Sequence, residues 1–338
     1  MTETRVRSSK MIAHHPLCRL AFRESSCFRG AWILVLIGCP LVTDSRAAPP
    51  ITAAAIAPDG NSVLLGSQSG IEIRNWPELV VVERLPTELS HVHDLRFSPD
   101  GKQLLAAGGV PAEQGEIELW AWPDRRRTRR MSIQEDVVYS VDWSADGQWW
   151  VTGGCGGGGG KAILFDAATA ERKGDYPGHS RPVLAVRFLD PQTVVSAGVD
   201  NTLRIWSVPE AKHLRTLDNH LGAVNDLAFS PSANPKSEPI LGSASEDRTV
   251  RLWQPRIGRL MRFARLASVP RCLVWAADGQ HLIAGCNDGR LRFIDAQSME
   301  IVRELDGGRG RIHQLILDAR RERILVVGEQ GCDGIALR

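Results

Sequence analysis

Short runs of apolar residues alternate with polar turn residues along most of the chain. The runs are four to seven residues long and rich in Val, Ile, Leu, Phe and Trp, as in Val92–Phe97, which the turn Ser98–Lys102 follows. Asp-Gly pairs stand between such runs in Pro58–Gly60, Pro99–Gly101, Ala145–Gly147 and Ala277–Gly279. Asp-Gly is a strong hairpin signal because Gly accepts the positive φ of a tight turn. No segment keeps a helical apolar period over a helical length, so the pattern predicts an all-β fold.

One strand-like pattern recurs every 41 to 47 residues. Its copies are Ile71–Arg74, Ile117–Trp120, Ala162–Phe165, Leu203–Trp206, Val250–Trp253, Leu291–Ile294 and Ile335–Arg338. A period of roughly 40–45 residues with four short strands per unit is typical of a β-propeller. We therefore predict a seven-bladed β-propeller of four-stranded antiparallel blades. Because a blade buries its faces only against its neighbours, residues 48–338 are expected to form one domain.

The fourth and fifth units resemble the WD-repeat propellers. The fourth unit has Gly178-His179 ahead of the run Val183–Phe188, and the fifth has His220 ahead of Val224–Pro231. In that family one His, one Ser or Thr, one Asp and one Trp of a unit form a buried hydrogen-bond chain, which rigidifies the blade when every member has a partner. The resemblance implies two such chains, His179–Ser196–Asp200–Trp206 and His220–Ser243–Asp247–Trp253.

The other five units depart from this motif. Glu88 stands where the second unit would have its His, and a glycine tract, Gly153–Lys161, replaces the turn Asp of the third unit. Arg74, Ile294 and Arg338 take the Trp position in the first, sixth and seventh units. The resemblance therefore extends over most of the chain in rhythm but over only two units in full motif.

The register also predicts which residues surround the mouth of the central channel. Each inner strand has two adjacent positions there. The first positions are Thr52, His93, Tyr139, Leu184, Asn225, Arg271 and His313, and the second are Ala53, Asp94, Ser140, Ala185, Asp226, Cys272 and Gln314. Tyr and Arg are frequent hot-spot residues of protein interfaces. We take as the candidate partner-binding rim His93, Asp94, Tyr139, Asn225, Asp226, Arg271 and His313; the alternative is a solvated rim without a partner.

Residues 1–47 form a basic N-terminal region with a signal-like segment. The apolar run Ala31–Val42 follows Arg19, Arg23 and Arg29, and Ser45-Arg46-Ala47 suits a cut after Ala47. Leu36–Cys39 resembles the lipobox of bacterial lipoproteins, with Cys39 as the lipidated residue. The run is shorter than the ~20 residues of a membrane span. Export to the cell envelope, periplasmic or lipid-anchored, is favoured over an uncleaved cytoplasmic protein, and membrane contact is expected only through this segment.

The same region is also expected to close the ring. The seventh unit reaches only its third strand at Ile335–Arg338, and the register places the missing outer strand at residues 38–44. In propellers of the WD-repeat type the outer strand of the last blade is often supplied by the N-terminus. A cut after Ala47 would remove this strand, whereas a cut before Cys39 would keep it.

Charge and cysteine content exclude several functions. The net charge of +2 gives no global electrostatic signature for nucleic acid, so no nucleic-acid partner is expected. Asp124–Arg130 holds five Arg, interpreted as a charged edge strand, with an anionic partner as the alternative. No CxxC pattern supports a zinc site, and Cys272 and Cys286 are expected to be buried thiols rather than a disulfide. Gly153–Lys161 fails the phosphate-loop pattern, because Cys155 and Ala162 stand where Gly and Ser or Thr are needed.

These observations favour a non-enzymatic protein that acts as a rigid scaffold for a protein or peptide, as the resemblance to WD-repeat proteins implies. It is expected to need no cofactor and to be a monomeric ring. The alternative is a propeller enzyme, hydrolase- or lactonase-like, with its site in the central channel. A third possibility is a purely structural role in a larger assembly. Asp94 and Asp226 are the only acids at the predicted mouth, which is thin support for the enzyme.

Overall fold

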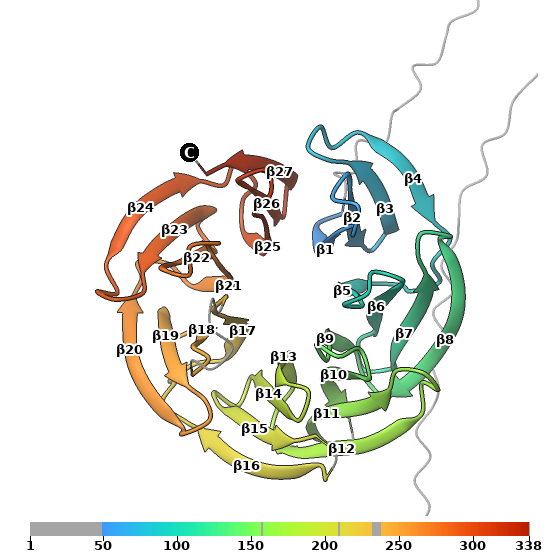
Figure 1. Cartoon of the computed structure of the whole chain (residues 1–338), viewed down its shortest axis with the longest axis horizontal. Helices are drawn as coiled ribbons and strands as arrows, with labels where there is room; N and C mark the ends of the chain where they lie inside the picture. Colours follow the sequence, from blue (N-terminus) through green and yellow to red (C-terminus); the bar gives the residue numbers. More distant parts are fainter. Residues whose placement is uncertain (1–48, 157, 209, 232–237, 338) are drawn as a thin grey trace, which may run out of the picture. The chain divides into compact units, whose positions relative to one another are not determined.

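The computed structural model describes residues 49–156, 158–208, 210–231 and 238–337. These residues form 27 strands arranged as seven blades around a channel (Figure 1), and no helix is found among them. The predicted all-β, seven-bladed propeller is confirmed. The predicted signal-like segment 31–42, closing strand 38–44 and lipidation site Cys39 lie outside the described residues, so they stay predictions of the sequence.

The blades share one antiparallel meander, from an inner strand at the channel to an outer strand at the periphery. The inner strands are β1 (Ile51–Ile56), β5 (Val92–Phe97), β9 (Val138–Trp143), β13 (Val183–Asp190), β17 (Val224–Phe229), β21 (Pro270–Trp275) and β25 (Ile312–Asp318). The second strands are β2 (Ser62–Ser67), β6 (Gln103–Val110), β10 (Trp149–Gly156), β14 (Thr193–Gly198), β18 (Leu241–Ser245), β22 (His281–Cys286) and β26 (Arg323–Gly328).

The third strands are β3 (Gly70–Asn75), β7 (Gln114–Ala121), β11 (Gly159–Asp166), β15 (Leu203–Ser207), β19 (Thr249–Gln254), β23 (Arg290–Asp295) and β27 (Gly331–Ala336). The outer strands are β4 (Val81–Leu85), β8 (Arg126–Gln134), β12 (Arg172–His179), β16 (Lys212–Leu217), β20 (Arg259–Arg265) and β24 (Ile301–Asp306). Blades 1 to 6 are four-stranded in this order, and blade 7 has the three strands β25, β26 and β27 within the described residues.

The turns form where the Asp-Gly pairs predicted them. Gly60, Gly101, Gly147 and Gly279 all have φ between 65° and 71°, a region that strains residues with a Cβ. In the second blade the Asp100 carboxylate accepts hydrogen bonds from the Ser98 hydroxyl, at 2.6 Å, and from the Lys102 N–H, at 3.0 Å. The turn is therefore held by its own side chains, which explains why it can be recognised from local sequence.

The glycine tract is a hairpin of two paired strands rather than the flexible turn that its composition suggests. Strands β10 and β11 keep pairing as far as Gly156 and Gly159. A Cβ on Gly153 would lie 2.8 Å from Val183, and one on Gly160 would lie 2.0 Å from the Arg181 carbonyl oxygen. Gly153 and Gly160 have no room for a side chain because the chain that enters the next blade passes directly against them.

The core lies between blades, in clusters that each combine residues of two neighbours. One cluster joins Ile73 and Leu85 of the first blade to Leu95 and Trp120 of the second. Blades 7 and 1 meet in a cluster that joins Leu325 and Val327 to residues of blade 1, and this contact closes the ring. Cys272 and Cys286 are buried free thiols, as expected.

Candidate interaction site at the channel and its mouth

The seven inner strands line a central channel of about 1030 Å³. In each inner strand the second, third and fifth residues face the channel or the neighbouring inner strand. The second and third residues are the two positions predicted at the mouth, and we call them the first and second positions. We call the seven first-position residues the mouth ring: Thr52, His93, Tyr139, Leu184, Asn225, Arg271 and His313. All seven line the channel, at the end where the inner strands begin.

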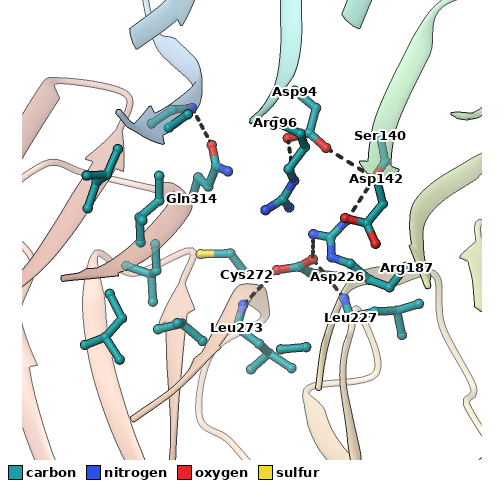
Figure 2. A pocket seen from close by; sticks show the side chains of 18 of the residues that line it. Asp94, Arg96, Ser140, Asp142, Arg187, Asp226, Leu227, Cys272, Leu273 and Gln314 are labelled. Atoms are coloured by element: carbon teal, nitrogen blue, oxygen red, sulfur yellow. Dashed lines mark hydrogen bonds and ion pairs between the residues drawn. The ribbon is translucent and has the colours of Figure 1, made fainter. Parts of the chain in front are cut away.

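Four of the seven second-position residues, Asp94, Ser140, Asp226 and Gln314, connect a blade to the next. Asp94 accepts a hydrogen bond from the Val141 N–H at 3.0 Å, and Asp226 accepts one from the Leu273 N–H at 2.9 Å. Gln314 does the same for Ala54 across the ring closure, at 2.6 Å (Figure 2). The donors belong to inner strands, each of which is the edge strand of its sheet and has no strand partner on one side. The side chain from the preceding blade therefore accepts the main-chain hydrogen bond that a partner strand would otherwise accept.

Asp94 and Asp226 each serve two blades at once. Both follow a blade that offers only alanine, Ala53 or Ala185, at the equivalent position. Asp94 therefore also accepts the N–H of Leu95 in its own strand, at 2.9 Å, and Asp226 accepts that of Leu227, at 2.8 Å. Figure 2 shows the Asp226 carboxylate turned toward Leu227 and Leu273. Their acid groups are thus engaged in holding the ring together.

Two other members of the mouth ring also make contacts between blades. The Asn225 side-chain amide donates to the Pro270 carbonyl oxygen at 3.0 Å, and the Thr52 hydroxyl donates to the Val92 carbonyl oxygen. Pro270 and Val92 are both the first residue of the following inner strand. Of the candidate rim, His93, Tyr139, Arg271 and His313 make no hydrogen bond to the main chain of a neighbouring inner strand in the described part of the chain, although Arg271 contacts the Asn225 side chain at 3.4 Å.

An aromatic group occupies one side of the mouth. The ring of His93 meets the edge of Tyr139 with 5.4 Å between centroids, and His91 stacks on His93 at 6.3 Å. Burial, together with the neighbouring His91, lowers the pKa of His93 to about 4 although Asp94 opposes the shift, so the ring is neutral at pH 7. The Tyr139 hydroxyl has no hydrogen-bond partner in the described part of the chain.

An arginine occupies the other side of the mouth. The Nε of Arg271 donates to Asn287 at 2.7 Å, and a terminal nitrogen pairs with Glu246 at 3.1 Å. These contacts fix the guanidinium at the channel opening without burying it. Burial also lowers the pKa of the nearby His313. The mouth therefore combines a neutral aromatic side with a positioned cation.

Deeper in the channel, the charges gather on one wall. The fifth residue of the inner strand is charged in blades 2, 3 and 4, where it is Arg96, Asp142 and Arg187. In blades 5, 6, 7 and 1 it is apolar: Ala228, Val274, Ile316 and Ala55. Arg187 donates to Asp226 and to the Ser140 hydroxyl, both at 3.1 Å (Figure 2). Burial raises the pKa of Asp142 and of Asp226 despite the two arginines. This arrangement suits binding of a partly apolar group.

The channel offers no recognisable metal centre within the residues that the structure describes, since no group of three or more His, Cys, Asp or Glu side chains is arranged to hold one. The acids that sequence reasoning placed at the mouth, Asp94 and Asp226, accept main-chain N–H groups instead. Sequence reasoning missed Arg96, Asp142 and Arg187, although charged residues at the fifth position of an otherwise apolar inner strand were visible.

Away from the channel, the structure joins the four side chains of each motif in blades 4 and 5. In blade 4, His179 contacts Asp200 through Nδ1 at 2.9 Å and Ser196 through Nε2 at 2.8 Å. The indole N–H of Trp206 donates to the same Ser196 hydroxyl at 2.8 Å. Although burial acts to raise it, the hydrogen bonds from His179 and Thr202 lower the pKa of Asp200 to about 2.

Blade 5 repeats this geometry. His220 contacts Asp247 at 2.8 Å and Ser243 at 2.7 Å, and the Trp253 indole donates to Ser243 at 2.8 Å. Burial lowers the pKa of His220 to about 4, against the effect of Asp247. In each case the histidine lies at the end of the outer strand of the preceding blade or just after it, and the network ties it to the second and third strands of the next blade.

Acidic side chains pair with two of the four arginines of strand β8. Arg127 pairs with Glu88 and with Glu118, and Arg130 pairs with Glu88 and with Glu116. Arg125 pairs with Glu83 of the preceding blade. The structure therefore favours the interpretation of Asp124–Arg130 as a charged edge over that of an anion site.

Comparisons with known proteins agree with this architecture. Residues 127–166, 170–207 and 211–254 match the family model described as WD domain, G-beta repeat. Residues 244–318 match the model described as Anaphase-promoting complex subunit 4 WD40 domain. The second and third stretches of the first model contain the complete networks of blades 4 and 5.

Curated relatives are similar at low identity. THO complex subunit 3 of Arabidopsis thaliana is 28% identical over 127 residues, 37% of this chain and 40% of that protein. Cell division cycle 20.1, cofactor of APC complex, of Arabidopsis thaliana is 25% identical over 249 residues, 70% of this chain and 51% of that protein. Pre-mRNA-processing factor 17 of Homo sapiens is 31% identical over 147 residues, 42% of this chain and 24% of that protein. The chain thus spans about half or less of the length of these relatives.

The relatives correct one prediction. Cell division control and pre-mRNA processing are processes of the cell interior, so the similar proteins indicate the cytoplasm or nucleus, and the prediction of export is wrong. The apolar run 31–42 suggested export because apolar length and basic flanks alone cannot separate a signal from other apolar segments. No finding supports a signal peptide or lipidation of Cys39. A search of the described residues finds no helix of the length and apolar character needed to span a bilayer.

Proposed function

This chain belongs to the WD-repeat family of β-propellers, and from that premise we propose that it is a non-enzymatic docking platform whose mouth ring binds a protein or peptide. The relatives support this proposal, because by name one is a subunit of the THO complex and another is a cofactor of the APC complex. A ring whose blades are connected by buried hydrogen bonds is a rigid scaffold. Rigid scaffolds commonly position the surface side chains that bind a partner.

The observation that carries the proposal is the set of mouth side chains that are not used in hydrogen bonds to the main chain of the next inner strand. His93 and Tyr139 remain as an aromatic pair on one side, and Arg271 remains as a cation held by Asn287 and Glu246 on the other. Tyrosine and arginine with little freedom left to lose are the side chains that most often dominate binding energy. A peptide with an apolar and an acidic or carbonyl group suits this pair.

The test uses peptides selected from a random display library on the full-length chain. We expect the double variant Tyr139→Ala, Arg271→Ala to bind the selected peptides at least about tenfold more weakly by calorimetry. Its melting temperature should stay nearly unchanged, because the contacts that Arg271 makes to Asn287 and Glu246 are at the surface.

The matched control is Arg320→Ala, which removes an exposed arginine that also lines the channel but belongs to the loop after β25. Binding should be unchanged in this control. Unchanged binding in the double variant would refute the assignment of the mouth ring. A loss in the Arg320 variant instead would move the site to the opposite end of the channel.

A further inference from the structure

The outer strand of blade 5 carries a positive charge that nothing in the described part of the chain cancels. Between Arg248 and Leu266 the sequence has six arginines and no Asp or Glu. Arg251 pairs with Asp247 and Arg256 with Asp190. Those on strand β20 itself, Arg259, Arg262 and Arg265, are all exposed, and none has an ion pair among the residues described.

Strand β8 occupies the same place in blade 2 and serves as an internal comparison. Two of its four arginines, Arg127 and Arg130, pair with Glu88, Glu116 and Glu118. The other two, Arg126 and Arg129, have no ion pair among the described residues. Arginines along an edge strand keep two copies of a protein from pairing edge to edge, and paired arginines serve that purpose. The unbalanced charge of β20 goes beyond that need, and it produces a local field that attracts anionic groups.

Strand β20 also exposes an aromatic ring among its arginines. Phe263 stands between Arg262 and Arg265 with 52% of its surface exposed, and the guanidinium of Arg251 lies over its ring at 5.6 Å. Phe263 and Arg265 share a face with Arg251, while Arg262 lies opposite Leu252 on the other face. Positive charge is thus present on both faces of the strand, and the apolar contact on one.

The outer side of β20 is a free strand edge. The strand is the last of its sheet, and its seven residues present main-chain N–H and C=O groups over roughly 20 Å. An extended peptide can add to such an edge through main-chain hydrogen bonds, while its side chains alternate between the two faces. A phosphate backbone would use the arginines but not the strand edge, so the combination favours a polypeptide.

We propose that the edge of β20 binds an extended acidic segment of a partner protein by strand addition. Carboxylates of the segment pair with Arg262 and Arg265 on the two faces, and one apolar side chain packs on Phe263. This surface lies at the periphery of blade 5, apart from the mouth ring, so the proposal goes beyond the docking function of the channel and does not depend on it.

The test uses a fluorescein-labelled peptide as long as β20, with both Glu and Val on each of its two faces, and fluorescence anisotropy with the full-length chain. We expect Arg262→Glu, Arg265→Glu to weaken binding at least about tenfold, and Phe263→Ala to weaken it by a smaller factor. A peptide of equal charge with Pro at alternate positions should bind more weakly, because Pro removes the N–H groups that pair with the edge.

The matched control is Arg126→Glu, Arg129→Glu on strand β8, which changes the net charge of the protein by the same amount. This control should bind the peptide as tightly as the unmodified chain. The proposal is overturned if both double variants lose the same affinity, since the effect would then be one of net charge. It is also overturned if the Pro-containing peptide binds equally well, or if single-stranded oligothymidylate binds more tightly than the peptide and depends on the same arginines.

Discussion

Blade 2 holds its third strand with different polar contacts from those of blades 4 and 5. In each, a third strand ends in a tryptophan buried against the neighbouring blade, at Trp206, Trp253 and Trp120. In blades 4 and 5 the indole N–H donates to a serine hydroxyl, which a histidine also contacts. In blade 2 the serine position is Ala106, and within the described residues the Trp120 indole nitrogen has no partner.

Blade 2 is held instead by a buried carboxylate on its third strand. Glu118 accepts the Thr87 hydroxyl at 2.7 Å, the Glu88 N–H at 2.9 Å and the Arg127 guanidinium at 2.7 Å. The loop before the inner strand is thus tied to the third strand in both solutions, by a His–Asp pair in one and by a Glu in the other. The difference shows that a repeat without the full motif keeps its fold when another side chain supplies the hydrogen bonds that hold the loop before the inner strand.

The largest expected effect comes from making blade 4 resemble blade 2. Ser196→Ala removes the hydroxyl that both His179 and Trp206 contact, and leaves two buried polar nitrogens without a partner. Each such group costs about 1–3 kcal/mol, so we expect unfolding to become easier by about 2–4 kcal/mol, measured with urea.

Ser62→Ala is the matched control, because no side-chain hydrogen bond is found for Ser62 in the described part of the chain. It should change the stability by less than about 0.5 kcal/mol. If Ser196→Ala is no more destabilising than this control, the network does not stabilise blade 4. Blades 2 and 4 would then not differ in how polar contacts stabilise them.

The second expected effect is a dependence on pH that blade 5 has and blade 2 lacks at this position. His220 has a pKa of about 4 when folded, against 6.5 in the unfolded chain, so its stabilising effect is complete above pH 6.5 and is lost as the pH falls from 6.5 to 4. The loss should be about 2 kcal/mol between pH 7 and pH 5.

His93 and His313 shift in the same direction and add to the same window, so the measurement must compare variants. The variant His220→Gln should lose less stability than the unmodified chain between pH 7 and pH 5, in parallel urea titrations. Equal losses would show that His220 is protonated alike in both states. Glu88, the corresponding residue of blade 2, should give no such difference when changed to Gln in this pH window.

The smallest expected effect tests the solution in blade 2. Glu118→Gln keeps the size of the side chain and one acceptor oxygen but removes the charge that pairs with Arg127. Arg127 is partly exposed, so we expect a loss of about 1 kcal/mol by urea unfolding. Glu78→Gln, at an exposed position, should change stability by no more than a few tenths of a kcal/mol. A stability unchanged in Glu118→Gln would indicate that shape alone holds the blade.

Features that depend on a few consecutive residues could be predicted well from the sequence. The turns at Asp100-Gly101 and Asp146-Gly147 are held by their own side chains, so their sequence is a sufficient signal. The register of the inner strands followed from these turns, and it placed the seven residues of the mouth ring at the channel. The function of those residues did not follow, because Asp94 and Asp226 find their partners in the next blade, 47 residues away along the chain.

The same limit explains why the two arginine-rich strands were not told apart. The dense run in Asp124–Arg130 attracted notice, whereas the arginines of β20 are spread at every third residue. Only the folded chain brings Glu88 and Glu118 against Arg127 of β8, and leaves the arginines of β20 without an ion pair among the described residues. Export was predicted from an apolar run alone, and similar proteins, not the run itself, corrected it.

The sequence by itself determined the strands, the turns and the number of blades, because alternation and Asp-Gly pairs act within a few residues. The members of the two complete networks were implied by the resemblance to WD-repeat propellers. The tertiary structure alone decided which polar groups remain available to a partner. Whether a buried or half-buried polar group has a hydrogen-bond partner depends on which side chain the neighbouring blade places within about 3 Å of it. That blade is one full repeat away in the sequence.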